Sequence, residues 1–375
     1  MDKLLECREQ IDKIDNQILD LFLERMRVCY DVAEYKIEHG KPVLDRSREL
    51  SKIETLKKKA PDKFFELGIS ELFEQIMAMS RKMQYNLLNS KGMIESLGFE
   101  EIRHIPKSNV KVVYQGIPGA YSSQAARAYF EDDVELVHTH SFRGAVEKVK
   151  NGEVDYAILP YENSSAGIVA DVYDLLVEYD TYILDTFEIK IDHCLCGLKG
   201  SKLEDIKEVY SHPQALMQSN EYIQKHGFDS YNMANTAISA KYISEQTDMT
   251  RACICSEEAA NIYGLEILEK GVNFANQNAT KFIIINNQKI TRRYADLVCI
   301  SFEMPHESGS LYQVLSHIIF NNLNMTGIQS RPVPDQKWEY RFYVEFEGKL
   351  TSEAVLNALN GVKQESKNLK ILGSY

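Results

Sequence analysis

The sequence has no uninterrupted apolar run that approaches the roughly 18 residues of a membrane-spanning helix. Asp2, Glu6 and Glu9 interrupt the N-terminal segment, which therefore lacks the charged-then-apolar layout of a signal peptide. Basic residues are too few to balance the acidic ones, with 43 Lys and Arg against 55 Asp and Glu and a net charge of −12. These absences argue against a membrane protein and against a nucleic-acid surface, and we expect a cytoplasmic protein with small-molecule partners.

The seven cysteines include no Cys-x-x-Cys pair, which is the spacing that metal sites usually use. Instead, residues 194 and 196 and residues 253 and 255 form two Cys-x-Cys pairs in apolar surroundings. Alternation along a strand puts both thiols of such a pair on one face. We expect buried free thiols in a reducing compartment, and neither a metal nor a cofactor is implied.

Glycine and proline are missing from the beginning of the chain until Gly40 and Pro42, and apolar residues there keep helical spacing. This pattern predicts one helix of nearly forty residues, about 55 to 60 Å long. Two more helices are predicted at about residues 45–59 and 70–88. A monomeric domain of 90 residues cannot cover so long a first helix, so we expect an intertwined three-helix domain in a homodimer or higher homo-oligomer.

Polar side chains are spaced along these predicted helices. Arg25 and Lys36 are eleven residues apart, almost three whole turns, and therefore share a helix face. Arg8 precedes Arg25 by seventeen residues and points roughly 100° away, so one helix cannot aim all three cations at one ligand. The complete set consists of Arg8, Arg25, Lys36, Asp45, Arg48, Glu49, Ser80 and Gln84. The set resembles, position by position, the active site of the all-helical chorismate mutases, and the resemblance covers residues 4 to 88.

This resemblance implies that Arg8 comes from the partner subunit and that, together with Arg25, it clamps the two carboxylates of chorismate. Arg48 would support the carboxylate end of the substrate. Asp45 and Glu49 would hold its ring hydroxyl. The product of the reaction would be prephenate.

Lys36 and Gln84 would donate hydrogen bonds to the ether oxygen of chorismate, with Ser80 nearby. A Claisen rearrangement passes no proton to the enzyme and needs no nucleophile. Acceleration therefore comes from folding the substrate into its reactive shape and from stabilising charge on the breaking ether bond. Fixed donors suit that reaction.

From residue 109 onward the pattern changes to short β-rich runs that alternate with helices, which is the layout of an α/β domain. The runs are residues 110–114, 156–159, 252–255 and 281–285. One run ends in Pro-Tyr-Glu-Asn-Ser-Ser-Ala-Gly at residues 160–167, and helical apolar spacing follows. Free N–H groups at a helix N-terminus attract carboxylates, so this strand end is suited to hold a small anion.

Four motifs in this region resemble those of the prephenate dehydratases, in the order of that family. Residues 115–122 resemble its glycine-rich first turn, and residues 162–167 resemble its Glu-Asn-Thr-Ser-Ser-Gly motif. Residues 210–214 contain Ser-His-Pro-Gln, and residues 278–282 correspond to the Thr-Arg-Phe motif with Lys281 in place of arginine. The resemblance implies a two-lobed α/β domain like a periplasmic binding protein, with prephenate in the cleft.

In such a domain the chain would cross between the lobes near Lys190 and return near Leu268. Prephenate loses its carboxylate and ring hydroxyl in one aromatising step, which needs an acid near the hydroxyl and cationic or N–H groups at the carboxylates. We expect Thr280 to hydrogen-bond the leaving hydroxyl, with Glu162 as a proton source if its pKa is raised. The other residues expected in the cleft are Ser122, Asn163, Ser164, Ser165, His212, Gln214 and Lys281.

Two of these cleft residues have competing interpretations. His212 precedes a proline in a turn, where a histidine ring serves a backbone carbonyl about as often as it acts as an acid. Lys281 would add charge at a substrate carboxylate, but a point charge in place of a planar guanidinium loosens a bidentate contact. The remaining five would position the substrate or line the cleft.

The last part of the chain reads as strand, helix, strand, strand, helix, strand. The predicted strands are residues 297–303, 325–331, 339–346 and 369–372, and the helices are residues 308–320 and 352–359. This α+β, ferredoxin-like βαββαβ order resembles an ACT domain, which binds amino acids at a subunit interface. Its phenylalanine site would use Gly309, Ser310 and Leu311 and, from the facing subunit, Asn324, Met325, Thr326, Gln329, Ser330 and Arg331. Glycine at a helix start and proline at a strand end are also common at the boundaries of helices and strands that bind no ligand.

We therefore expect three domains, at residues 1–92, 109–287 and 296–375. The combined resemblances imply a bifunctional enzyme that converts chorismate to prephenate and prephenate to phenylpyruvate, with inhibition by phenylalanine. Two alternatives are a dehydratase whose helices only dimerise and an amino-acid-binding regulatory protein. The eight polar helix positions disfavour the first alternative, and the motifs around Thr280 and Glu162 disfavour the second.

Overall fold

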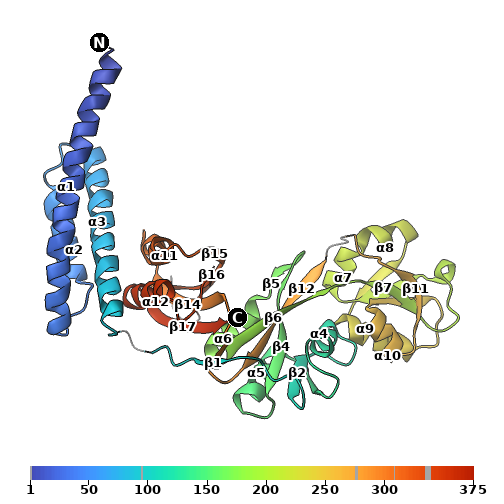
Figure 1. The fold of residues 1–375 in the computed structure, drawn as a ribbon. Helices are drawn as coiled ribbons and strands as arrows, with labels where there is room; N and C mark the ends of the chain where they lie inside the picture. The colour runs from blue at the N-terminus through green and yellow to red at the C-terminus, as the bar shows by residue number, and fades with distance from the viewer. Residues whose placement is uncertain (1, 94–95, 275–277, 308, 334–338) are drawn as a thin grey trace. The chain divides into compact units, whose positions relative to one another are not determined.

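The computed structural model describes residues 2–93, 96–274, 278–307, 309–333 and 339–375. It divides into two compact units, whose elements Figure 1 shows. Unit 1 comprises residues 1–97 and 300–370, and unit 2 comprises residues 98–299 and 371–375. Within the described residues, no helix combines the length and apolar character needed to cross a membrane.

The N-terminal part of unit 1 is helical, with α1 at Lys3–Glu38, α2 at Arg46–Lys57 and α3 at Lys63–Ser90. The predicted long helix is confirmed, because the 36 residues of α1 span about 54 Å at the standard rise. An aspartate begins each helix: the carboxylates of Asp2, Asp45 and Asp62 accept hydrogen bonds from backbone N–H groups of the first turn.

The third helix begins earlier than predicted, at Lys63 rather than near Ser70. Gly68 lies inside it and costs about 1 kcal/mol relative to alanine. The Asp62 cap offsets that cost, because its carboxylate accepts from the N–H groups of both Phe64 and Phe65. A glycine in a helical pattern therefore does not mark the boundary here.

The C-terminal part of unit 1 confirms the predicted order of strands and helices. Its elements are β14 (Leu297–Pro305), α11 (Ser310–Phe320), β15 (Met325–Pro332), β16 (Glu339–Glu347), α12 (Glu353–Glu365) and β17 (Lys367–Ser374). The strands lie in the order β15-β16-β14-β17. Ser308, the predicted start of the first helix, lies outside the described residues. The second helix runs beyond its predicted end at Leu359, and it contacts α3 and α11.

The first lobe of unit 2 is an α/β sheet with the strand order β6-β12-β4-β2-β3. Its elements are β2 (Lys111–Gln115), α4 (Tyr121–Tyr129), β3 (Glu135–Thr139), α5 (Phe142–Lys150), β4 (Tyr156–Asn163), β5 (Gly167–Ile168), α6 (Ala170–Glu178), β6 (Tyr182–Lys190) and β12 (Ala279–Asn286). Strand β5 pairs with β4, and the short strands β1 (Glu100–Ile102) and β13 (Ile290–Arg292) pair with each other.

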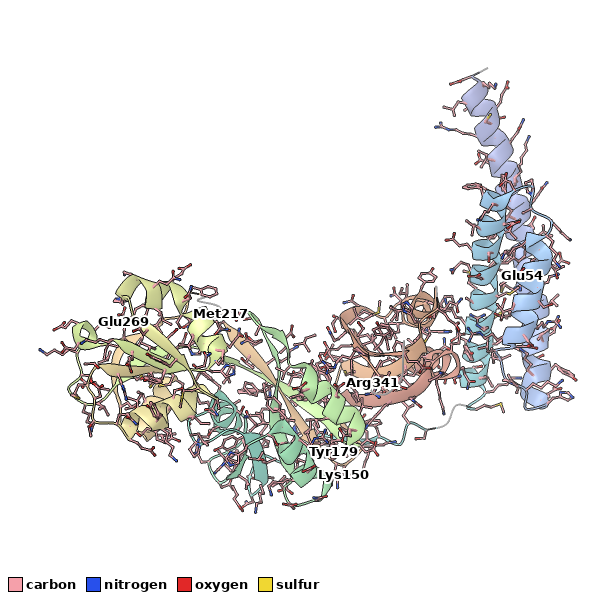
Figure 2. The ribbon with its side chains drawn as sticks, turned by 180° about the vertical axis from the view of Figure 1, so that it is seen from behind. Glu54, Lys150, Tyr179, Met217, Glu269 and Arg341 are labelled. Carbon is pink, nitrogen blue, oxygen red and sulfur yellow. The ribbon has the colours of Figure 1, made fainter. Side chains whose placement is uncertain are left out.

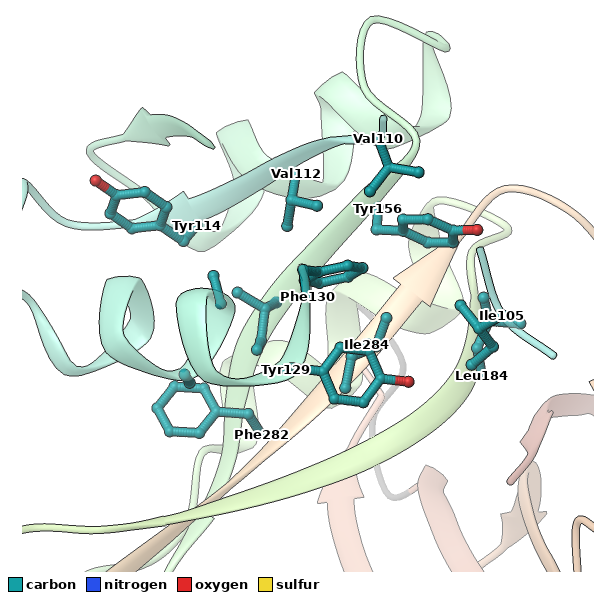
Figure 3. Packing of buried hydrophobic residues seen from close by; sticks show 13 residues of the cluster. Ile105, Val110, Val112, Tyr114, Tyr129, Phe130, Tyr156, Leu184, Phe282 and Ile284 are labelled. Atoms are coloured by element: carbon teal, nitrogen blue, oxygen red, sulfur yellow. The ribbon is translucent and has the colours of Figure 1, made fainter. Parts of the chain in front are cut away.

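One face of this sheet packs on α4 and buries an aromatic core that includes Tyr114, Tyr129, Phe130 and Phe282 (Figure 3). Helices α5 and α6 contact each other as well. Figure 2 shows their ends, at Lys150 and Tyr179, close together. Strands β4 and β12 pair directly from this core up to Asn163 and Thr280.

The second lobe has the strand order β11-β7-β10-β8-β9. Its elements are β7 (Cys194–Gly197), a 3₁₀ turn (Leu203–Asp205), β8 (Glu208–Ser211), α7 (Pro213–Gln218), α8 (Asn220–His226), β9 (Asp229–Asn232), α9 (Thr236–Ser244), β10 (Arg251–Cys255), α10 (Glu257–Ile262) and β11 (Glu266–Lys270). The chain enters this lobe after Lys190, as predicted, and leaves it after Lys270, two residues later than the predicted Leu268.

The two Cys-x-Cys pairs meet across this sheet. Strands β7 and β10 are antiparallel and put Cys194 opposite Cys255 and Cys196 opposite Cys253. All four thiols are free, buried and part of one apolar cluster. Cys299 is also buried, so the expected burial is confirmed for five of the seven cysteines, whereas Cys7 is exposed and Cys29 is half-buried.

Candidate active sites

The first candidate site lies among α1, α2 and α3. Arg25 donates a 2.6 Å hydrogen bond to the Ser80 hydroxyl. Gln84 follows Ser80 by one turn and donates to the Ser80 carbonyl at 3.2 Å. Ser80 and Gln84 are buried, and Gln84 Oε1 has no hydrogen-bond partner within the described part of the chain. A buried amide with unused bonding capacity suits a site that binds a polar ligand.

Lys36 lies near the end of α1, where it donates to the Val43 carbonyl. Burial lowers the pKa of Lys36 below 10.5, and the nearby carboxylates of Asp45 and Glu49 oppose this shift. The Asp45 carboxylate accepts from the Arg48 backbone N–H and the Ser47 hydroxyl, and these hydrogen bonds lower the pKa of Asp45.

Cys29 lies near Arg25 and Ser80 and also near Lys36. Its sulfur lies 3.6 Å from Arg25 Nη1 and 3.5 Å from Ser80 Oγ, and it interacts electrostatically with Lys36. Arg8 is the exception: it is exposed and lies seventeen residues, about 25 Å, before Arg25 along α1. Its predicted place in the partner's site stays a prediction.

Arg81 was not among the predicted site residues, yet it binds one of them. Arg81 donates to the Glu49 carboxylate at 2.5 Å and to the Glu365 carboxylate of α12 at 2.6 Å. The side chains of Arg81 and Glu365 are only 6% and 5% exposed. A cavity of about 250 Å³ is lined by Glu49, Arg81, Ser310 and Glu365, among others. Only tertiary packing brings Glu365 to this position, more than 280 residues from Arg81 in the chain.

The second candidate site lies in unit 2 where β4 ends and β12 begins. Their antiparallel pairing puts Asn163 opposite Thr280, and Asn163 Nδ2 donates to Thr280 Oγ1 at 2.9 Å. The Ser165 hydroxyl donates to Asn163 Oδ1 at 2.8 Å. The Ser164 hydroxyl accepts from the Ala279 N–H at 3.0 Å. Asn163, Ser165 and Thr280 are thus joined by side-chain hydrogen bonds where β4 ends and β12 begins, and Ser164 is held by the adjacent Ala279.

Three buried side chains complete this group, and none was a predicted site residue. Asn278 Nδ2 donates to Gln218 Oε1 at 3.0 Å, and Gln218 Nε2 donates to the Ser165 hydroxyl at 2.5 Å. His193 Nε2 lies 3.0 Å from the same Gln218 oxygen. The available signals were the place of Asn278 inside the last motif and the position of Gln218 one helical turn after Gln214.

Strand register separates Glu162 and Lys281 from this group. These two residues are partners in the β4–β12 pairing, one position along from the pair of Asn163 and Thr280. Neighbouring residues of a strand point to opposite faces, and Asn163 points toward Thr280. Glu162, which is exposed, and Lys281 therefore point away from the Thr280 hydroxyl. The register argues against the predicted role of Glu162 as the proton source beside Thr280.

The other predicted cleft residues lie near helix starts. His212 Nδ1 accepts from the Gln214 N–H at 3.2 Å and so caps α7, and burial lowers the pKa of His212. This geometry favours the structural interpretation of His212. Ser122 is buried in the first turn of α4, and Gln214 Nε2 is buried without a hydrogen-bond partner among the described residues.

The glycine-rich turn before α4 contacts the second lobe. Gly119 has a φ of +87°, and a Cβ atom at this position would lie 2.9 Å from Ala259 Cα in α10. The Gly119 carbonyl accepts from the Ser256 hydroxyl at 3.2 Å. A larger residue would therefore both strain the backbone and push the lobes apart.

The residues predicted to bind phenylalanine are at least partly accessible, and none of the nine is buried. Gly309 precedes α11 with a φ of +79°. On β15, which lies at the edge of the strand order given above, Thr326 donates to Glu345 at 2.7 Å. Gln329 Nε2 donates to the Ser330 carbonyl at 3.4 Å. The remaining predicted members are Ser310, Leu311, Asn324, Met325 and Arg331.

Comparison with known proteins supports two catalytic regions. Residues 7–85 match the family described as chorismate mutase type II, and residues 112–290 match prephenate dehydratase. A bifunctional chorismate mutase/prephenate dehydratase from Buchnera aphidicola subsp. Schizaphis graminum is 31% identical over 99% of this chain and 96% of its own length. The corresponding protein of Escherichia coli K12 is 29% identical over 99% of this chain and 96% of its own.

A solved structure is similar to the part of the chain after the helices. Prephenate dehydratase from Arthrobacter aurescens, determined in complex with L-Phe, is 26% identical, with a TM-score of 0.66. The match covers 71% of this chain and 89% of that one. Full-length similarity above 30% identity, together with both family matches, shows that the chain belongs to the bifunctional chorismate mutase/prephenate dehydratases.

Proposed function

We propose that the protein performs the two activities of its family at two separate sites, making prephenate among the helices and phenylpyruvate at the ends of β4 and β12. The observation that carries this assignment is the coexistence of both polar groups in a chain that aligns along 99% of its length with a bifunctional relative. The buried free thiols favour a reducing compartment, so we place these steps of phenylalanine biosynthesis in the cytoplasm.

At the helical site, Arg25 binds a chorismate carboxylate while Lys36 and Gln84 donate to the ether oxygen. Negative charge grows on this oxygen as the C–O bond breaks, so donors fixed beside it lower the barrier. Arg48 supports the carboxylate end, and Asp45 and Glu49 hold the ring hydroxyl. Burial of Ser80 and its bond to Arg25 support this orientation of the arginine.

The helical site is completed by Arg8 from a second subunit in a homodimer or higher oligomer. Leu4, Ile11, Ile14, Ile18 and Leu21 of α1 are 53–66% exposed in the single chain. An apolar stripe of this length on a helix is typical of a surface covered by a partner. A second copy packed on the stripe would bring its Arg8 toward the Arg25 end of this chain.

At the second site, Thr280 donates a hydrogen bond to the ring hydroxyl of prephenate. The bond between ring and carboxylate breaks and its electron pair enters the ring, while the ring hydroxyl takes up one proton from solvent and leaves as water and carbon dioxide is released. Asn163, Ser164 and Ser165 position the substrate, and Ser122 and Gln214 line the cleft. Thr280 is only 8% exposed, which supports a dry environment in which a single hydroxyl has a large effect.

The C-terminal module binds phenylalanine and lowers dehydratase activity. The similar Arthrobacter enzyme was solved with L-Phe, which supports this assignment for a chain with 26% identity. The accessible Gly309 turn and the edge strand β15 support a site that a facing subunit completes.

The decisive test is formation of phenylpyruvate from chorismate by the purified protein, followed by absorbance in alkali, with prephenate supplied to a parallel sample. Product from both substrates supports two activities. Product from prephenate alone would identify a dehydratase whose helices only dimerise. Phenylalanine binding without product from either substrate would identify a regulatory protein.

A further inference from the structure

Two segments that connect the lobes of unit 2 bring His193 to the dehydratase site. His193 lies between β6 and β7, and its backbone N–H donates to Asn273 Oδ1 of the returning segment at 3.0 Å. The Val272 N–H donates to the His193 carbonyl at 3.0 Å. His193 is 3% exposed, so its ring must find hydrogen-bond partners inside the protein.

The backbone determines which way the Asn163 amide faces. Asn163 Oδ1 accepts from the N–H groups of Ser165 and Ala166, at 3.1 and 2.9 Å, and a backbone N–H can only donate. Asn163 Nδ2 donates to the Ala279 carbonyl, which can only accept. In the opposite orientation, the amide nitrogen would face the two backbone N–H donors and the amide oxygen would face the Ala279 carbonyl, so these hydrogen bonds could not form.

The orientation of the Asn163 amide determines the orientations of the neighbouring Asn278 and Gln218 amides. Asn163 Nδ2 donates to Asn278 Oδ1 at 3.0 Å, so the Asn278 nitrogen faces Gln218 and donates to its Oε1. Gln218 Nε2 then faces Ser165 and donates to its hydroxyl. The Ser165 hydroxyl is free to donate to Asn163 Oδ1.

The direction of these bonds fixes the tautomer of His193. Gln218 Oε1 accepts, so His193 Nε2 must carry a proton to bond to it. Burial lowers the pKa of His193 to about 4, so the ring is neutral near pH 7 and its Nδ1 atom is an acceptor. The Tyr121 hydroxyl lies 2.9 Å from that atom and donates to the Asp192 carbonyl at 2.8 Å, and burial raises the pKa of Tyr121 well above 10, so this hydroxyl keeps its proton.

We propose that His193 is a positioning residue for the dehydratase reaction. Its Nε2–H donates to Gln218 Oε1, Gln218 Nε2 donates to the Ser165 hydroxyl, and this hydroxyl lies 2.8 Å from Asn163 Oδ1. Asn163 Nδ2 can only donate, and its two N–H groups are shared among Asn278 Oδ1, the Ala279 carbonyl and Thr280 Oγ1, so the proton of Thr280 is directed elsewhere, toward the substrate. The inference rests on the proposed dehydratase function and adds to it a buried group that holds Gln218 and Ser165 in place beside Asn163.

The test compares two substitutions of similar polarity in the full-length protein. In His193→Gln the amide nitrogen takes the place of Nε2 and still reaches Gln218, whereas in His193→Asn the shorter amide reaches only the Tyr121 side. We expect His193→Asn to lower kcat for prephenate about tenfold or more, with KM changed less than about threefold. His193→Gln should keep kcat within about threefold of wild type.

Tyr121→Phe removes a single oxygen and provides a second variant that does not enlarge the side chain. We expect it to lower kcat no more than about threefold, since His193 then loses the neighbouring hydroxyl but keeps its hydrogen bond to Gln218. Chorismate mutase activity should equal that of wild type in all three variants, and near-ultraviolet circular dichroism should show that the chain remains packed.

Two results would overturn the inference: a His193→Asn enzyme with kcat within twofold of wild type, or a His193→Gln enzyme that loses as much kcat as His193→Asn. Failure of the proposed function has a different signature, because wild-type protein would then release no phenylpyruvate from prephenate. Wild-type turnover is therefore measured first, in the same samples.

Discussion

The helical site and the α/β site differ in how their working groups are held. The helical site uses charged side chains such as Arg25 and Lys36 on long helices, and Arg8 lies far from them in the single chain. The α/β site uses neutral amides and hydroxyls, among them those of the buried Gln218 and Thr280, that are joined by hydrogen bonds within one unit. A cation attracts negative charge from many directions, whereas a neutral donor is useful only when its direction is set. One site can therefore be assembled from two chains, while the other needs a connected interior.

Lys36→Ala should break the helical site alone. We expect chorismate mutase activity to fall because the ether oxygen loses its charged donor. The transition state should lose about 3 to 4 kcal/mol of stabilisation. Dehydratase activity, measured with prephenate in the same preparation, should be unchanged. Lys52→Ala removes an exposed lysine of α2 and serves as the matched control. Equal loss of both activities would indicate unfolding rather than loss of a donor.

Mixing subunits sharpens the comparison. Arg8→Ala and Lys36→Ala proteins are each expected to be inactive as mutases. After subunit exchange, a mixed dimer would contain one site with both native residues, so activity should return. The α/β site has no such shared residue, and Thr280→Ala mixed with Asn163→Ala should show no recovery. Absence of mutase recovery despite proven exchange would argue against Arg8 acting in the partner's site.

Thr280→Ala should break the α/β site alone. We expect dehydratase turnover to fall about a hundredfold or more, while chorismate is still converted to prephenate, which accumulates. Thr280→Ser keeps the hydroxyl and should retain much of the activity. The measurement is release of phenylpyruvate from prephenate, with prephenate followed separately. Normal turnover in the alanine variant would exclude Thr280 from catalysis.

The pH dependence of the two activities should also differ. Burial lowers the pKa of Lys36 below 10.5, and the mutase needs the protonated ammonium group. Mutase activity should therefore decline as the pH rises through this lowered value, up to about tenfold per unit above it. Dehydratase activity should not decline in this pH range, and Lys36→Gln should abolish the pH-dependent decline of mutase activity. Parallel decline of both activities would instead point to alkaline unfolding.

The smallest expected effect concerns phenylalanine binding. Gln329 offers the ligand's ammonium group only a neutral hydrogen bond, and charge-assisted bonds are about twice as strong. Gln329→Glu should therefore bind phenylalanine about fivefold more tightly in calorimetric titration. Ile328→Glu adds the same charge on the neighbouring exposed position and should have little effect. No binding by either wild type or Gln329→Glu would reject the proposed sensing site.

Local patterns in the sequence predicted most of the fold. The absence of glycine and proline before Gly40 was enough to predict α1, and strand and helix periodicity predicted the C-terminal order. These features depend on residues that are near one another in the chain. The start of α3 at Lys63 was missed because the Asp62 cap stabilises the helix while the interior Gly68 destabilises it. Neither residue alone shows which of the two effects is larger.

The candidate site was less predictable because its geometry depends on strand register. Motif order placed Glu162 beside Asn163 as a site residue, but alternation along β4 directs these neighbours to opposite faces. His193 carries no motif, and it reaches Gln218 only because the chain passes twice between the lobes. Such contacts join residues that are distant in sequence, and no periodicity indicates them.

The position of Arg81 has a consequence for communication within unit 1. One guanidinium holds a carboxylate of the mutase site, Glu49, and a carboxylate of the C-terminal module, Glu365. Both carboxylates bind N–H groups whose directions are fixed by the planar guanidinium, so we expect a displacement of α12 to change the hydrogen bond to Glu49. With Glu49 in the proposed chorismate site, we expect a ligand that displaces α12 to change the affinity for chorismate, and chorismate to change the affinity for that ligand by the same factor.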